Sequence, residues 1–212
     1  MNIDVDHLRG QFLGALIEDV QIARKRLGEN NLQPDRRNLV RATSAAIEGM
    51  LWYLRLAAID YSNEILPLID IEVMALREMN YVVRNNGKVE EQIRFVPLLS
   101  MVRLLSNIYN KVLGVETIDF SSSEWSNFQQ AAEIRNRITH PKSAQDIKID
   151  PNDVEVSQRA LFCFFAIAIE WMDKSNKALK SHSDDYRALL ENMRAGDPDA
   201  LNVYALALKM EG

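Results

Sequence analysis

One short segment in the second half of the chain concentrates the residue types that could do chemistry. Residues 135–141 read Arg-Asn-Arg-Ile-Thr-His-Pro. An arginine such as Arg135 binds anions through a planar fork of permanently charged N–H donors. A histidine such as His140 exchanges protons near neutral pH. The sequence therefore predicts that any chemistry of this chain centres on this segment.

The same residues would also suit an ordinary helix end. Cationic side chains near a helix C-terminus stabilise it by roughly 0.3–1 kcal/mol each, and proline commonly follows the last turn. Residue types alone leave both interpretations open.

The spacing of Arg135 and His140 needs a break in the helix if the two side chains are to meet. On a continuous helix, residues five positions apart diverge by about 140°. Pro141 disfavours the helical conformation for His140, so this residue can leave the helix end and turn toward Arg135. Asn136, four positions before His140, could then orient the imidazole.

The surrounding sequence predicts mostly helices. Apolar residues recur at helical spacing within six stretches. These stretches are residues 3–27, 37–61, 68–79, 98–113, 123–139 and 153–180. Only 8 glycines and 6 prolines interrupt the chain of 212 residues, which also favours long helices.

Several local signals refine this prediction. Ser121 and Glu124 have the spacing of a capping box, and Asp150 with Pro151 suits a helix start. Residues 81–96 suggest a small β-hairpin that turns at Asn86-Gly87. A polar run, residues 181–185, is expected to end the long helix and lead into a terminal helical hairpin. The predicted fold is all-α, with one small β-hairpin.

Composition limits the possible locations and partners. The net charge of −5 excludes a protein that coats nucleic acid by bulk attraction, although a local basic pocket remains compatible. Cys163 is the single cysteine, so no intrachain disulfide forms, and we expect it to be a small buried residue. The start of the chain lacks a signal-peptide pattern, and the apolar run 160–169 is too short to span a bilayer. A cytoplasmic location is expected.

The segment 135–141 and its setting resemble the HEPN superfamily, whose signature is an arginine, a polar residue, a few further positions and a histidine. The order of helices is also similar. A long helix carrying Ala-Ala-Ile-Glu-Gly (residues 45–49) precedes a variable middle, the motif helix and an apolar helix with an Asp-Pro start. The resemblance covers roughly residues 37–180 of a single helical domain, 1–212, and leaves 181–212 as a C-terminal helical extension.

The resemblance implies an up-and-down bundle of four to five helices, often dimeric, here with N- and C-terminal helical extensions. Many HEPN members are metal-independent endoribonucleases that serve as toxins or in abortive-infection defence against phage. Other members act as binding or assembly modules. For this chain it therefore implies a ribonuclease, or alternatively a non-catalytic module that binds a nucleotide, RNA or a protein partner.

The resemblance also assigns roles to the segment. His140 would take the proton of a ribose 2′-OH, and general base catalysis is typically worth about 10²–10⁴-fold. Arg135 would bind the phosphate oxygens as negative charge builds on them. Asn136 and Thr139 would position His140 or the phosphate. The expected product carries a 2′,3′-cyclic phosphate.

Three further charged residues are candidates for the same site. Glu48 lies on a polar edge of the helix 37–61, where related proteins often carry a polar site residue, but it could equally pair with Arg41 or Arg55. Arg137 and Lys142 could hold the RNA backbone, or form an ordinary solvated surface.

The expected partners follow from this reading. We predict RNA bound in a local cleft, a second copy of the chain, and an antitoxin or defence partner, with no membrane and no cofactor. Trp52 and Tyr53 point away from the apolar stripe of their helix, which suggests a subunit contact or a second packing partner. Neither His7 nor His182 has neighbours at metal-ligand spacing, so no metal is assigned.

Overall fold

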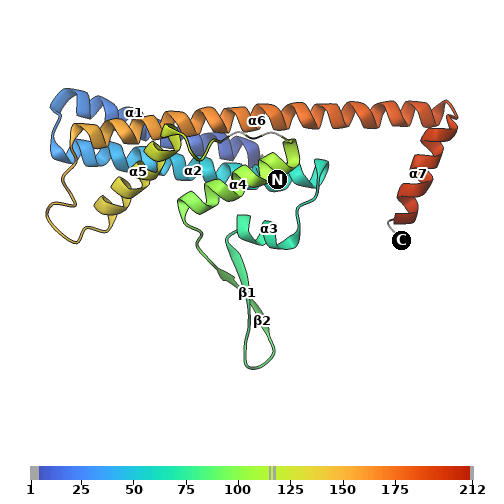
Figure 1. Ribbon diagram of the computed structural model, residues 1–212, viewed down its shortest axis with the longest axis horizontal. Helices are drawn as coiled ribbons and strands as arrows, with labels where there is room; N and C mark the ends of the chain where they lie inside the picture. The colour runs from blue at the N-terminus through green and yellow to red at the C-terminus, as the bar shows by residue number, and fades with distance from the viewer. Residues whose placement is uncertain (1–4, 115, 117, 211–212) are drawn as a thin grey trace.

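The computed structural model describes residues 5–114, 116 and 118–210, with side-chain burial for most of residues 10–206 (Figure 1). In chain order the elements are α1 (Val5–Asn30), α2 (Gln33–Ile65), α3 (Asp70–Leu76), β1 (Met79–Val83), β2 (Val89–Ile93), α4 (Leu98–Leu113), α5 (Ser123–Thr139), α6 (Pro151–Arg194) and α7 (Pro198–Met210). The prediction of an all-α fold with one small β-hairpin is confirmed.

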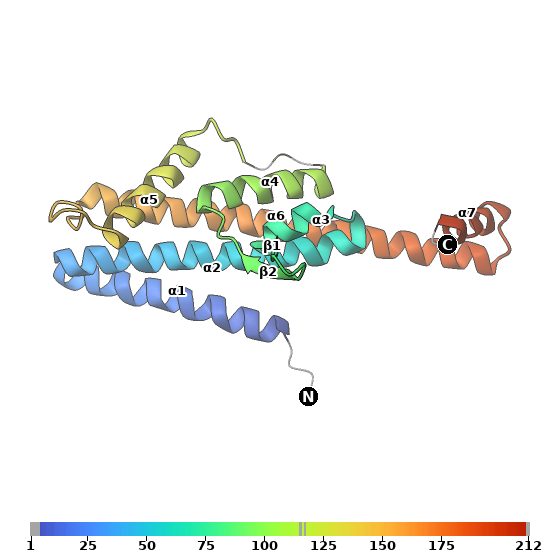
Figure 2. The same cartoon turned by 90° about the horizontal axis from the view of Figure 1, so that it is seen from below.

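The core lies between α2 and α6, which run side by side along the molecule. α1 packs along one side of α2, while α4 and α5 cover the other side (Figures 1 and 2). Tyr109 of α4 stacks on Trp171 of α6 with ring centroids 4.5 Å apart, and both rings are buried. The Tyr109 hydroxyl donates a hydrogen bond to the Leu54 carbonyl of α2 over 3.3 Å, and burial raises the pKa of this phenol. These contacts join three helices into one apolar core.

Helices α4 and α5 have the predicted bounds. Gly114 ends α4 in the left-handed conformation, with φ at 67°. The N-cap of α5 is Ser122, whose hydroxyl accepts a hydrogen bond from the Trp125 amide over 3.2 Å. The capping box predicted at Ser121 is therefore wrong, because Asp119 binds both the amide and the hydroxyl of Ser121.

The predicted break at residues 181–185 is also wrong. α6 continues through this polar run to Arg194, because the run holds neither glycine nor proline and its side chains are mostly exposed. The chain turns only at Gly196, with φ at 79°, and Pro198 begins α7. The last part of α6 extends beyond the bundle, and α7 turns steeply away from its end (Figures 1 and 2).

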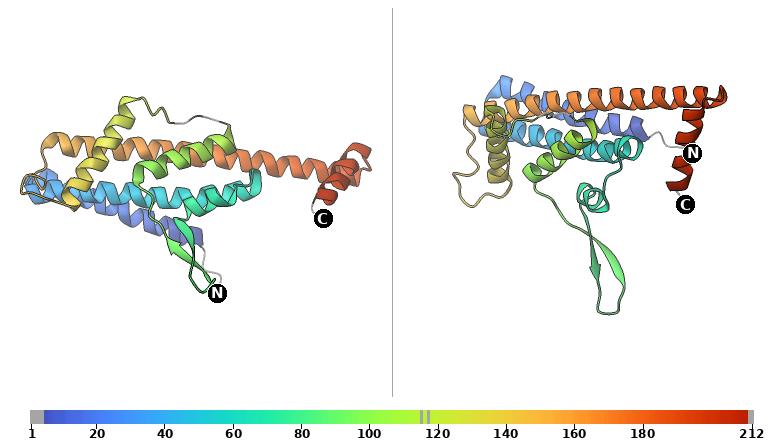
Figure 3. Two further views of the ribbon diagram at one scale, coloured as in Figure 1. Left: turned by 60° about the horizontal axis from the view of Figure 1, so that its bottom comes forward. Right: turned by 45° about the vertical axis from the view of Figure 1, so that its right-hand side comes forward.

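The β-hairpin projects from the bundle (Figure 3). β1 and β2 pair antiparallel from Met79 opposite Ile93 to Val83 opposite Val89. Gly87 adopts φ at 77° in the predicted turn.

Trp52 finds a packing partner inside the chain. Its ring meets Phe12 of α1 edge to face, with centroids 5.5 Å apart, although the side chain keeps 40% of its exposure. Tyr53 is partly buried. For Trp52, the sequence predicted either a subunit contact or a second packing partner, and α1 supplies the packing partner.

Cys163 is only partly buried, so the prediction of a buried thiol is correct only in part. Burial raises the pKa of this thiol, and the charge of Glu124 raises it further. None of the helices described here is both long enough and apolar enough to cross a bilayer.

Candidate functional site

A cavity of about 710 Å³ brings together most of the predicted site residues. The end of α5, the loop after it, α2 and the connection between β2 and α4 all contribute to its wall. The lining residues are Glu48, Phe95, Pro97, Leu98, Ala132, Arg135, Asn136, Arg137, His140, Lys142 and Asp146. Of the predicted residues, Thr139 alone is not part of this wall.

His140 leaves the helix in the way that Pro141 predicts. Its backbone has φ at −125° and ψ at 59°, outside the helical region, while its amide still closes the last turn by donating to the Asn136 carbonyl over 2.9 Å. Its side chain is exposed, and no residue in the described ranges hydrogen-bonds the imidazole. The imidazole is therefore accessible to a ligand in the cavity.

Arg135 is held by a residue from another helix. Its Nη2 lies 2.7 Å from Oε1 of Glu48 on α2, and its Nη1 donates to Oδ1 of Asn136 over 3.1 Å. The side chains of Arg135 and Glu48 keep 32% and 43% of their exposure, and an ion pair this exposed contributes at most about 1 kcal/mol. The pair therefore orients the guanidinium without closing it to an anion, although Glu48 offsets part of its charge.

Glu48 does not pair with Arg55, one of the two partners considered from the sequence. Arg55 instead binds Glu78, with Nη1 and Oε2 2.7 Å apart.

Asn136 and Thr139 hold the arginine more directly than the histidine. The Asn136 amide oxygen accepts from the Arg135 guanidinium. The Thr139 hydroxyl donates to the Arg135 carbonyl over 2.7 Å, a bond within the helix. In this structure the Asn136 side chain binds Arg135 and makes no hydrogen bond to the His140 ring.

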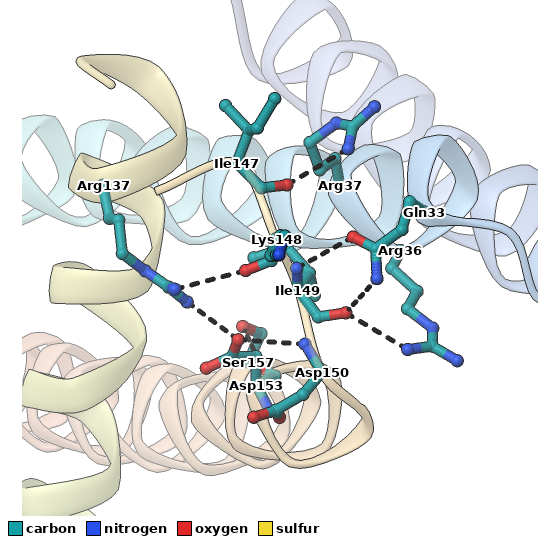
Figure 4. Close-up of polar contacts among 10 residues, drawn as sticks. All are labelled: Gln33, Arg36, Arg37, Arg137, Ile147, Lys148, Ile149, Asp150, Asp153 and Ser157. Atoms are coloured by element: carbon teal, nitrogen blue, oxygen red, sulfur yellow. Dashed lines mark hydrogen bonds and ion pairs between the residues drawn. The ribbon is translucent and has the colours of Figure 1, made fainter. Parts of the chain in front are cut away.

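Arg137 ties the end of α5 to the start of α6 (Figure 4). Its Nη2 lies 2.8 Å from Oδ2 of Asp153, and its Nη1 donates to the Lys148 carbonyl over 3.2 Å. Asp153 in turn exchanges hydrogen bonds with Asp150 at the N-cap of α6. Arg137 therefore has a structural role, and its predicted contact with an RNA backbone is untested.

The loop that follows His140 is fastened to the start of α2 (Figure 4). Gln33 donates to the carbonyl of Ile149 and accepts from its amide, over 2.8 and 2.9 Å. Arg36 donates to the same carbonyl over 3.2 Å, and Arg37 to the carbonyl of Ile147 over 3.1 Å. These bonds hold one end of the loop that carries Pro141.

Asp146 holds the other end of the loop, beside the cavity. Its carboxylate accepts from the backbone amides of Lys142 and Ser143 over 2.8 and 2.7 Å. These bonds, the Lys142 amide first, lower the pKa of the Asp146 carboxyl. The Lys142 side chain is exposed.

The charge on the cavity wall is mixed but positive on balance. Arg135, Arg137 and Lys142 face Glu48 and Asp146, which leaves one net positive charge on a protein whose total is −5. Such a wall suits a single phosphate group better than a long stretch of duplex.

Sequence reasoning missed two features of this wall. Asp146 carried the signal of a turn, since an aspartate commonly accepts from amides near it in sequence. Phe95 lies within the predicted hairpin 81–96, whereas in the structure β2 already ends at Ile93, and no pattern in the sequence indicated that Phe95 would reach the motif.

In the described part of the chain, no group of three or more histidine, cysteine, aspartate and glutamate side chains could hold a metal ion. Comparison with models of known protein families, with curated proteins and with solved structures finds no match to this chain.

Proposed function

We propose that this chain is a metal-independent endoribonuclease of the HEPN type, acting at the cavity that contains Arg135 and His140. One observation carries the proposal: the exposed imidazole of His140 and the oriented guanidinium of Arg135 line the same open cavity, although they are five positions apart. A proton acceptor beside an anion binder is what cleavage by a neighbouring hydroxyl needs.

In the proposed reaction His140 takes the proton of a ribose 2′-OH. The 2′-oxygen then attacks the adjacent phosphorus, the bond from phosphorus to the 5′-oxygen breaks, and that oxygen receives a proton from solvent. The products are a 2′,3′-cyclic phosphate and a 5′-hydroxyl. Arg135 donates to the phosphate oxygens while their negative charge grows, which lowers the barrier.

The remaining predicted residues support this pair. Glu48 and Asn136 hold the guanidinium from two sides. The exposed Lys142 is placed to bind a neighbouring phosphate of the RNA backbone. DNA lacks the attacking hydroxyl and is not a substrate under this proposal.

We extend the proposal to a homodimer that serves as a toxin or in phage defence, with an antitoxin or defence partner. The helix order α2, α5 and α6 around the motif supports the family assignment. Phe162 and Ile169 support self-association, because both are large apolar side chains left mostly exposed on α6. Light scattering tests this extension, and the mass of a single chain would contradict it.

A second function is favoured by the Glu48–Arg135 ion pair. Because Glu48 already binds the guanidinium, the cavity could serve a non-catalytic module that binds a nucleotide, RNA or a protein partner. This alternative predicts that Arg135→Ala weakens ligand binding, that His140→Ala changes little, and that no RNA is cut.

The experiment incubates the protein with total RNA in EDTA. The wild-type chain should cut RNA, and His140→Ala should lose at least about 10²-fold in rate. His182→Ala is the matched control, because His182 packs against Tyr186 on the extended part of α6. No cleavage by the wild type, or equal cleavage by His140→Ala, would overturn the proposal.

A further inference from the structure

Phe95 is an exposed aromatic residue on the wall of the candidate site. It follows β2, keeps 77% of its exposure and lines the same cavity as Arg135 and His140. A phenylalanine this exposed contributes little to the core, and its ring is accessible from the cavity.

The backbone on both sides of Phe95 is fixed by one residue, Glu78. The Arg94 amide donates to the Glu78 carbonyl over 2.7 Å, and the Val96 amide donates to Oε1 of the Glu78 side chain over 2.9 Å. The other carboxylate oxygen of Glu78 binds Arg55 of α2 over 2.7 Å. Phe95 is thus held in place against the bundle while its ring faces outward.

This anchor is costly in two ways. The side chains of Arg55 and Glu78 keep only 12% and 19% of their exposure, so two charges have been largely removed from water. Glu78 also has φ at 54°, a left-handed conformation that costs a non-glycine residue about 1–2 kcal/mol. Local strain of this kind commonly accompanies functional sites.

A second, smaller cavity continues beyond Phe95. It has a volume of about 190 Å³ and shares Glu48, Phe95 and Leu98 with the larger one. Trp52, 40% exposed, lies on its wall. Phe95 and the part of Trp52 that Phe12 leaves uncovered therefore line the same cavity, and Phe95 also lines the larger cavity with Arg135 and His140.

Aromatic rings beside cations are the arrangement by which proteins bind single-stranded nucleic acid. Each base stacks on a ring, and each phosphate meets a cation; stacking contributes about 1–3 kcal/mol per base. Paired bases in an A-form duplex are stacked on one another and cannot present a face to such rings.

We propose that Phe95 is a stacking platform for an unpaired base next to the phosphate bound by Arg135, and that Trp52 receives the next base. The proposal rests on the proposed ribonuclease function and names its substrate class. The substrate is single-stranded RNA, or an unpaired loop, with at least two unpaired bases on one side of the cleaved phosphate.

The test measures binding separately from cleavage. A fluorescein-labelled short oligoadenylate is titrated in EDTA with full-length His140→Ala, which leaves the RNA intact, and anisotropy gives Kd. Adding Phe95→Leu, which keeps apolar bulk and removes the ring, should weaken binding about 5- to 100-fold. Phe95→Trp should bind as tightly as the parent or more tightly.

Ile93→Leu, at the end of β2 and two residues before Phe95, is the matched control. Ile93 is even more exposed than Phe95 but lines neither cavity, so this substitution should leave Kd unchanged. Trp52→Leu should also weaken binding, and an RNA duplex of the same length should bind about tenfold or more weakly than the single strand. Because Phe95 is exposed, loss of folding does not complicate its substitution.

The outcomes separate this inference from the proposed function. Wild-type cleavage with an unchanged Kd in Phe95→Leu overturns the platform and leaves the ribonuclease standing. Binding of single-stranded RNA that depends on Phe95, without any cleavage by the wild type, supports the platform and overturns the ribonuclease. Duplex bound as tightly as the single strand, or no RNA bound at all, overturns the platform.

Discussion

Two arginine–glutamate pairs at the β-hairpin allow a controlled test of how Phe95 is held. Arg55 and Glu78 meet at the base of the hairpin, and Arg84 and Glu90 meet near its turn, with 2.7 Å between nitrogen and oxygen in both. Their burial differs: the first pair keeps 12% and 19% of its exposure, the second 57% and 50%. We predict that Glu78→Ala is far more destabilising than Glu90→Ala.

The magnitude follows from burial. Removing one partner of a buried ion pair costs about 3–5 kcal/mol, because the other charge is left without compensation. The buried Nε of Arg55 already lacks a hydrogen-bond partner among the described residues, so losing Glu78 leaves this guanidinium still less compensated. The Val96 amide also loses its acceptor, at about 1 kcal/mol. Arg55 keeps some exposure, so we expect about 3 kcal/mol for Glu78→Ala, against less than about 1 kcal/mol for Glu90→Ala.

Urea unfolding, monitored by circular dichroism, gives the free energy of unfolding of each variant. Because the hairpin projects from the bundle, amide hydrogen exchange at Val96 is the more local measurement and should show the larger change. Glu78→Gly should be about 1 kcal/mol less destabilising than Glu78→Ala, because glycine tolerates the positive φ. Replacing Arg55 and Glu78 together by leucine should recover most of the loss.

Equal effects of Glu78→Ala and Glu90→Ala on both unfolding and exchange would refute this reasoning. The hairpin would then be held by its apolar contacts rather than by the buried pair.

Three further predictions concern the site and the core. Arg137→Leu should lower the free energy of unfolding by about 1–3 kcal/mol, because it leaves Asp153 without its charged partner. Lys142→Ala should change this free energy by less than about 0.5 kcal/mol. Equal melting temperatures of the two variants would contradict the structural role of Arg137. Trp171→Ala should lower the free energy of unfolding by about 3–5 kcal/mol, because it removes the ring that stacks on Tyr109 and leaves a cavity. A loss of less than about 1 kcal/mol, measured by urea unfolding, would contradict this packing. The Asp146 carboxyl has a lowered pKa, so its hydrogen bonds to the loop amides persist at neutral pH and are lost as the pH falls through that lowered value. Carbon NMR of the carboxyl should give a titration midpoint below that of an ordinary aspartate, and a midpoint above it would contradict these bonds.

Local signals in the sequence predicted several elements well. Gly114 and Pro141 mark the ends of α4 and α5 because the first adopts positive φ and the second excludes a helical His140. The same proline predicted the departure of His140 from the helix. The run 181–185 does not end α6, because polar residues without glycine or proline are compatible with an exposed helix.

The partners across helices could not be predicted from the sequence. Whether Glu48 meets Arg135, Arg55 or Arg41 depends on how α2 is rotated against α5 and on the path of the hairpin, and helical periodicity fixes neither. Phe95 was missed for the same reason: only the anchor at Glu78 brings the strand end to the cavity.

The most direct test of the central claim is the chemistry of the RNA ends. Single-stranded RNA is incubated in EDTA with the wild-type chain, and the fragments are analysed by mass spectrometry. The account predicts 2′,3′-cyclic phosphate and 5′-hydroxyl ends, absent with His140→Ala and absent when the attacking ribose is 2′-deoxy. Fragments that end in 3′-hydroxyl and 5′-phosphate, or cleavage by His140→Ala at the wild-type rate, would contradict it.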